Sequence, residues 1–167
     1  MSEAKHLSIG LIESFNNPQS PLFVSFGTAT EGITAAQAAT VPGERMNSIW
    51  AVTNHVWFWN EVPLRMLRGE AVQPSDLGAP DMGGWVPIGD PNAEQAWQAA
   101  RARCIQSNLA LATLVAELSP EQMNVEIGGW GPVWSIVQAM FAHNAYHLGE
   151  IVTLRHLQGL WIDSKLV

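Results

Sequence analysis

The fold is decided by residues 133–158, VWSIVQAMFAHNAYHLGEIVTLRHLQ, in which apolar side chains recur at steps of three and four. This spacing is typical of a long helix that buries one face in a protein core. A glycine-rich break at residues 128–132 precedes the segment, and Gly159 follows it with the backbone freedom that commonly ends a helix. The sequence therefore predicts a helix over residues 133–158.

Three further segments share this spacing: residues 3–15, 44–68 and 90–118. In the second of them, Pro63 lacks a backbone donor, so it is expected to kink or shorten the last turns before Gly69 ends the helix. In the third, Asp90 and Pro91 supply an N-cap carboxylate and a first-turn proline, which together favour a helix start. With residues 133–158, these segments predict four main helices.

The stretches between the main helices contain two capping-box patterns, at residues 34–37 and 119–122, which predict short helices. The connection at residues 71–91 is longer than compact domains usually carry without a purpose, and we interpret it as a lid or a partner-contact loop. Strands do not alternate with helices anywhere in the pattern. The expected fold class is therefore all-α, a four-helix bundle with long connecting loops.

Composition limits the classes of function. The chain has 167 residues, 47% hydrophobic and 14% charged, with a formal net charge of -7, which predicts one globular domain over residues 1–167. The negative charge argues against nucleic acid as a partner. With no signal peptide and no run of about 20 apolar residues, a membrane is not an expected partner either. The single cysteine, Cys104, excludes an internal disulfide, is expected to be a buried packing residue, and favours the cytoplasm.

Three histidines form the candidate metal site. His143 and His147 are four residues apart, so they point within about 40° of each other on adjacent helical turns, and their apolar flanks place them on the inward face. His55 lies in the middle of the segment 44–68 and shares its face with apolar residues. Three imidazoles around one ion would leave a coordination position for water or substrate. The alternative is three core histidines that are each satisfied by separate hydrogen bonds.

Glu150 shares the histidine face, because it follows His147 by three residues and returns to within about 20° of His143. Four roles stay open for it: a fourth metal ligand, an acceptor for an imidazole N–H, a catalytic base, or an ordinary carboxylate at the edge of the core. His6 and His156 do not share this face and are expected at the surface.

Two motifs and the segment after them resemble the DinB-like family of four-helix-bundle metalloproteins. They are Ser48-Ile-Trp-Ala-Val-Thr-Asn-His55, Ala142-His-Asn-Ala-Tyr-His-Leu-Gly-Glu150 and Ile151-Val-Thr-Leu-Arg-His-Leu-Gln-Gly159. The resemblance implies an up-down-down-up bundle, often dimeric, in which His55, His143 and His147 hold a divalent metal ion. Where this sequence has Glu150, the family commonly has glutamine, so the chain adds a carboxylate to the expected site.

Two functions follow as hypotheses. The first is a metal-dependent enzyme acting on a small molecule, because some members of the family transfer low-molecular-weight thiols or isomerise thiol adducts and others are taken to be hydrolases. Zinc or nickel is expected at the site, iron and copper also suit three histidines, and Glu150 is the candidate catalytic residue. The second is a non-catalytic ligand-binding or structural homodimer, with or without a metal. Three tryptophans are candidate pocket walls, with packing in the core as the alternative for each: Trp59, Trp85 and Trp130.

Overall fold

The structure is a computed structural model that describes residues 1–163. Its elements are, in order, α1 (Glu3–Phe15), α2 (Phe26–Thr30), α3 (Ala35–Ala39), α4 (Ile49–Leu67), the short 3₁₀ helix η1 (Pro74–Leu77), α5 (Glu94–Ala116), α6 (Pro120–Met123) and α7 (Val133–Leu157). Within these residues the only β-type pairing is an isolated bridge between Glu126 and Pro132. The prediction of an all-α fold is confirmed.

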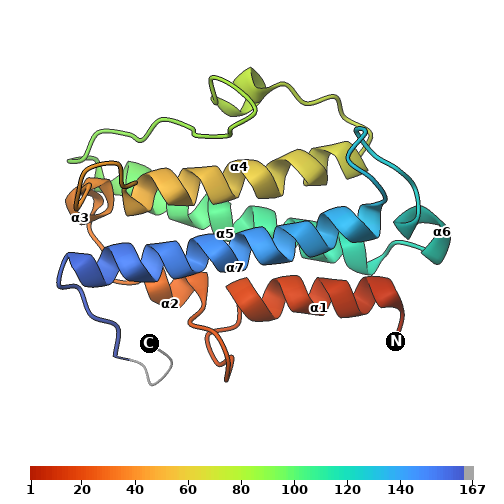
Figure 1. The fold of residues 1–167 in the computed structure, drawn as a ribbon, viewed down its shortest axis with the longest axis horizontal. Helices are drawn as coiled ribbons and strands as arrows, with labels where there is room; N and C mark the ends of the chain where they lie inside the picture. The colour runs from red at the N-terminus through yellow and green to blue at the C-terminus, as the bar shows by residue number, and fades with distance from the viewer. Residues whose placement is uncertain (164–167) are drawn as a thin grey trace.

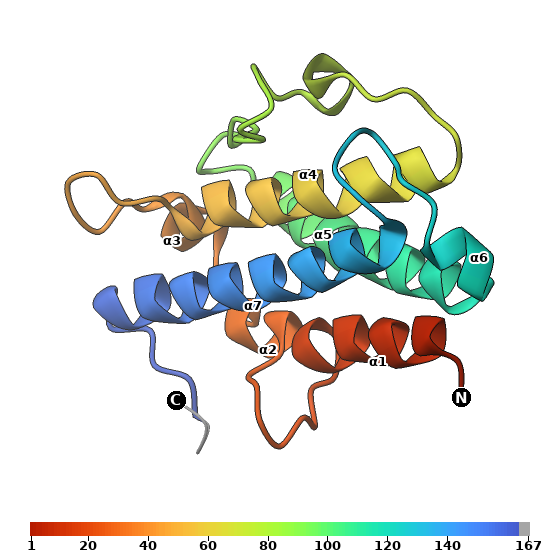
Figure 2. The ribbon, with the colours of Figure 1, turned by 45° about the vertical axis from the view of Figure 1, so that its right-hand side comes forward.

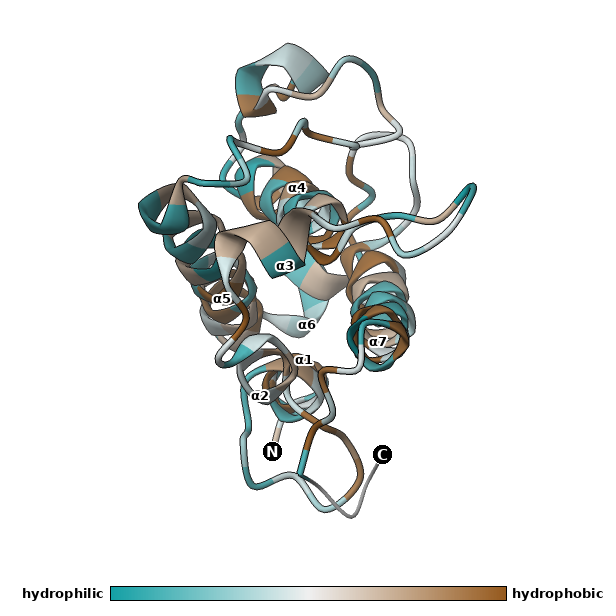
Figure 3. Ribbon diagram, turned by 90° about the vertical axis from the view of Figure 1, so that its left-hand side faces the viewer, coloured by the Kyte–Doolittle hydropathy of each residue, from teal (hydrophilic) through white to brown (hydrophobic). Residues whose placement is uncertain are grey.

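The long helices α1, α4, α5 and α7 surround a common interior. Helix α5 packs against α4 and α1, and α7 packs against the same two helices from the other side. Figure 3 looks approximately along these helices and shows their four axes around the core. The colour gradient of Figure 1 shows that α1 and α7 run in one direction, whereas α4 and α5 run in the other. None of the helices in residues 1–163 is long and apolar enough to cross a membrane.

Several predicted elements are confirmed. Helix α1 covers residues 3–15 as expected, and α7 ends one residue before the predicted boundary, with Gly159 at a φ of 73° beyond it. Both capping boxes form, so Thr34 is the N-cap residue of α3 and Ser119 is the N-cap residue of α6. Two short elements, α2 and η1, were not predicted, since neither is long enough to show a helical period.

The predicted start of the second main helix at residue 44 is wrong. Helix α4 begins at Ile49, after the N-cap residue Ser48, whose hydroxyl accepts a hydrogen bond from the backbone N–H of Ala51 at 3.1 Å. Arg45 has a φ of 58°, which is incompatible with a right-handed helix. The helix continues past Pro63 to Leu67.

The predicted start of the third main helix at residue 90 is also wrong. Asp90 accepts a hydrogen bond from the backbone N–H of Asn92 at 2.9 Å, so it caps a turn, and α5 begins at Glu94. The carboxylate of Glu94 accepts the N–H of Ala35 at 2.7 Å, in the first turn of α3. The carboxylate of Glu94, in the first turn of α5, therefore caps the neighbouring helix α3.

The core is built around aromatic side chains between the helices. Trp50 on α4 and Trp97 on α5 are buried with their ring centroids 5.6 Å apart. The indole N–H of Trp97 donates to the carbonyl of Ile33 at 2.8 Å, so burial leaves no polar group of this ring unpaired. Cys104 is fully buried as expected, and this burial raises the pKa of its thiol, which fits a packing role.

The long connection between α4 and α5 runs along the outside of α4 (Figure 1) and is tied to it by one buried amide. The side-chain N–H groups of Asn54 donate to the carbonyls of Val86 and Pro87, at 3.3 Å and 3.0 Å. Arg103 from α5 donates to the amide oxygen of Asn54 at 2.8 Å. These bonds fix the loop position of Trp85 over α4.

Gly84 packs closely against α4. Its φ is 72°, and an added Cβ would collide with the ring of Phe58. Only glycine combines that backbone conformation with such close packing.

We therefore expect Gly84→Ala to lower the free energy of unfolding by about 1–3 kcal/mol, because it adds a steric clash to backbone strain. Urea unfolding followed by tryptophan fluorescence measures the loss. Gly129→Ala is the matched control, since Gly129 has the same φ of 72° and no atom within 4 Å of an added Cβ. Equal losses in the two variants would show that packing against Phe58 is not the cause.

Candidate metal centre

Helices α4 and α7 bring the three predicted histidines together. His55 comes from α4, His143 and His147 come from adjacent turns of α7, and one ligand nitrogen from each can be chosen so that all three lie within 4.8 Å of one another. The Nε2 atoms of His55 and His143 are 3.2 Å apart. Two of the three side chains, His55 and His147, are only 6% exposed. The cluster therefore lies between α4 and α7 and is most exposed at His143.

The third ring is oriented by a carboxylate. Nδ1 of His147 lies 2.8 Å from Oε2 of Glu150, and since a carboxylate only accepts, the imidazole donates this hydrogen bond. The other carboxylate oxygen accepts from the side-chain N–H of Asn47 at 2.9 Å. With its proton on Nδ1, a neutral His147 keeps the lone pair of Nε2 for the cluster. Glu150 thus contacts the outer edge of a histidine.

Burial favours the neutral form of two of the rings. Desolvation, followed by the proximity of His147 and His143, lowers the pKa of His55 to about 4. Desolvation and the proximity of His147 lower the pKa of His143 to about 4 as well. Both rings are therefore neutral at pH 7, which is the form that binds metal ions.

A divalent ion fits this arrangement. In a tetrahedral zinc site with bonds of about 2.0–2.1 Å, neighbouring ligand atoms are about 3.4 Å apart, close to the 3.2 Å between the two Nε2 atoms. The donor set, three imidazoles, suits zinc, copper, iron and nickel alike.

Aromatic side chains border the cluster on two sides. Trp85 stacks on His55 with the ring centroids 4.0 Å apart and the planes at 15°. The ring centroids of Trp59 and His143 are 6.1 Å apart. Trp130 belongs to the loop after α6, and its ring centroid lies 5.8 Å from that of Trp59. Figure 2 shows that loop reaching the C-terminal half of α4. Of the three tryptophans proposed as pocket walls, Trp59 and Trp85 lie against the histidines, and Trp130 lies against Trp59.

Two cavities lie near the site, and none of the three histidines lines either of them. One of about 220 Å³ is lined by Trp59, Trp130 and Met140 among others, one turn before His143 on α7. The other, of about 530 Å³, is lined by Asn47, Glu150 and neighbouring residues. A larger cavity of about 820 Å³ lies at the C-terminal end of α4. The cavity one turn before His143 is small and mainly apolar.

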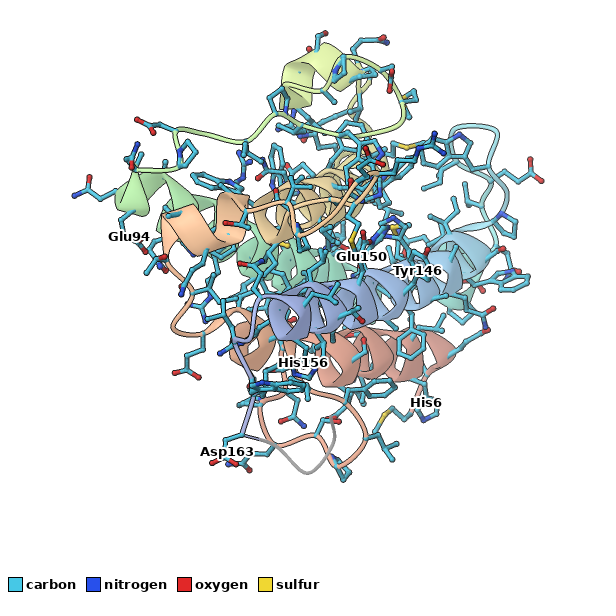
Figure 4. All side chains as sticks on the ribbon, turned by 60° about the vertical axis from the view of Figure 1, so that its left-hand side comes forward. His6, Glu94, Tyr146, Glu150, His156 and Asp163 are labelled. Atoms are coloured by element: carbon cyan, nitrogen blue, oxygen red, sulfur yellow. The ribbon has the colours of Figure 1, made fainter. Side chains whose placement is uncertain are left out.

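The remaining histidines lie elsewhere. Figure 4 shows His6 on α1 and His156 near the end of α7, both apart from Glu150. His6 is exposed, as predicted. The surface prediction for His156 is wrong, because this ring is half-buried and packs against Trp161 with centroids 4.5 Å apart. A tail after the helix covers it, which the helical period alone did not indicate.

Sequence reasoning missed the two asparagines that support the site. Asn54 fixes the loop that carries Trp85, and Asn47 contacts Glu150 across 103 positions of sequence. Asn54 is adjacent to His55, which is the only signal that could have drawn attention to it. Nothing in the sequence around Asn47 predicts a contact with α7.

The fold and the cluster together define a helical protein with a three-histidine site compatible with metal binding. The chain belongs to the DinB superfamily, whose family model matches residues 26–151 and so includes all three histidines. No significant match exists among curated proteins or solved structures. The resemblance noted in the sequence is confirmed at the level of the family.

The lowered pKa values of His55 and His143 predict a stability loss in acid for the metal-free protein. An unfolded histidine binds a proton near pH 6.5, whereas these folded rings do so only near pH 4, so stability is complete above about pH 6.5 and falls toward pH 4. We expect a loss of about 1–3 kcal/mol between pH 7 and pH 5, after discounting for solvent screening.

Urea unfolding of chelator-treated protein at both pH values measures this loss. The double variant His55→Gln/His143→Gln should show a smaller loss than the wild type, whereas the exposed-site control His6→Gln should show the same loss. An equal pH dependence in the double variant and the wild type would contradict the prediction.

Proposed function

We propose that the chain is a metal-dependent enzyme in which His55, His143 and His147 bind one divalent ion, zinc or nickel, and leave a coordination position for a reactant. We also propose that the four long helices form the up-down-down-up bundle of DinB-like proteins. The observation that carries the proposal is the convergence of ligand atoms from two buried histidines and one partly buried histidine within 4.8 Å. Two of these rings are held neutral, and the third is oriented through its outer nitrogen.

The ion, when bound, lowers the pKa of a water or a thiol and so supplies a nucleophile near neutral pH. The protein residues contribute orientation and shielding. Glu150 accepts the N–H of His147 and so aims the opposite nitrogen inward, which supports an orienting role in place of direct coordination. Trp59 and Trp130 line the small cavity one turn before His143 and favour an apolar part of a substrate there.

The reaction proposed is hydrolysis or thiol transfer on a small molecule, with a low-molecular-weight thiol as a candidate substrate. Three observations support a reactive site over a purely structural one. Glu150, the nearest carboxylate, is already hydrogen-bonded to His147 and Asn47. A cavity lies one turn of α7 before His143, and His143 is only partly buried. A homodimer in the cytoplasm stays a prediction from the sequence.

Metal content measured on untagged protein purified without chelator tests the proposal. We expect about one ion per chain in the wild type, and a loss of at least tenfold in affinity for zinc in each of His55→Ala, His143→Ala and His147→Ala. His6→Ala, which changes a histidine outside the cluster, should retain the ion. Thiol-transfer and ester-hydrolysis assays of the loaded protein then distinguish the reactions.

A folded wild type that takes up neither zinc nor nickel would contradict a metal-dependent function. Stoichiometric metal together with no exchangeable position, detected as a closed four-ligand spectrum of the cobalt-substituted protein, would favour the structural alternative.

A further inference from the structure

One loop residue outside the histidine cluster is connected to it by two hydrogen bonds in series. The side chain of Asn47 donates to Oε1 of Glu150 at 2.9 Å, and Oε2 of the same carboxylate accepts the N–H of His147 at 2.8 Å. Asn47 directly precedes the N-cap of α4, whereas Glu150 and His147 belong to α7. The series therefore joins the two helices that carry the histidines.

The orientation of Glu150 needs such a partner. Its side chain is 25% exposed, so water competes for both carboxylate oxygens and the carboxylate can turn away from the ring. A neutral imidazole without an acceptor at Nδ1 shares its proton between its two nitrogens, and only the form with the proton on Nδ1 offers Nε2 as a ligand. Fixing one oxygen of Glu150 keeps the other on His147.

We propose that Asn47 is a positioning residue for the metal site, acting through Glu150 to hold His147 in the tautomer that presents Nε2 to the cluster. This inference rests on the proposed metal-binding function for its consequence, but not for its geometry. Asn47 touches neither the cluster nor a reactant. Its contribution is to pair an amide donor with a carboxylate that stands where the family commonly has glutamine.

The hydrogen bond between residues 47 and 150 needs one donor and one acceptor, and the two residues can exchange these roles. Asn47 donates and Glu150 accepts, so an aspartate at position 47 places two carboxylates against each other and removes the donor. If glutamine replaces Glu150 at the same time, its amide oxygen can accept from His147 and its amide N–H can donate to the new aspartate. The double change therefore restores a continuous series with the roles reversed.

The experiment compares Asn47→Ala, Asn47→Asp, Glu150→Gln and the double variant Asn47→Asp/Glu150→Gln. Gln19→Glu is the matched control for added negative charge, because Gln19 is exposed and lies in the loop after α1. Two quantities are measured: the ¹⁵N shifts of the His147 ring in metal-free protein at pH 8, and the zinc dissociation constant by competition with a chromophoric chelator. Far-UV circular dichroism verifies that each variant is folded.

We expect the wild type and Gln19→Glu to show one tautomer, protonated on Nδ1. Asn47→Ala should give a mixture of tautomers and zinc binding weakened about 3- to 10-fold, and Asn47→Asp a loss of about 10- to 100-fold, within the range for partners of metal ligands. The double variant should return to the tautomer and affinity of Glu150→Gln. A purely structural role for Asn47 would not produce this recovery.

Unchanged ring shifts in both Asn47 variants would overturn the proposal, as would a double variant no better than Asn47→Asp. The metal-free ring shifts keep this test separate from the proposed function. If the wild type binds no zinc, the metal-dependent function fails, while the tautomer of His147 still decides the role of Asn47.

Discussion

Three imidazole rings gathered between α4 and α7, two of them buried and one partly buried, are the constraint on which the rest of the structure depends. Removing a polar ring from water is costly unless its nitrogens find partners, and the cost is larger for a charged ring. The structure lowers part of that cost by keeping His55 and His143 neutral, and it satisfies the outer nitrogen of His147 with Glu150. The nitrogens that converge have only one another and whatever binds between them.

The features around the cluster follow from this constraint. Trp85 covers one ring, so its loop must be held at a fixed height above α4, and Asn54 holds it through two backbone carbonyls. Arg103 in turn occupies the free oxygen of Asn54 and stacks over Trp57, with 3.9 Å from its guanidinium carbon to the ring centroid. Gly84 allows the close approach. A site built from two helices thus depends on a third helix and a loop.

The sequence predicted those parts of the site that a helical period can carry. His143 and His147 share a face because they are four residues apart, and His55 lies on an apolar face of its own helix, so each inward direction was readable. The failed boundaries have local causes: the φ of Arg45 interrupts α4, and Asp90 caps a turn. The role of Asn47 could not be predicted from the sequence, because its contact with Glu150 depends on how a loop packs against a helix 103 positions away.

Glu150 decides how the proposed site differs from one with glutamine at that position. Both carboxylate oxygens accept hydrogen bonds, one from His147 and one from Asn47, so ligation by this carboxylate would require breaking at least one of them. In the proposed site, the negative charge of Glu150 would therefore reach the ion only through the ring of His147, which it would make a stronger electron donor. A stronger donor would bind the ion more tightly, and the ion would then withdraw less electron density from a reactant. Under the proposed function, the chain gains affinity for its metal and gives up some of the acidity that three histidines with an amide partner would provide.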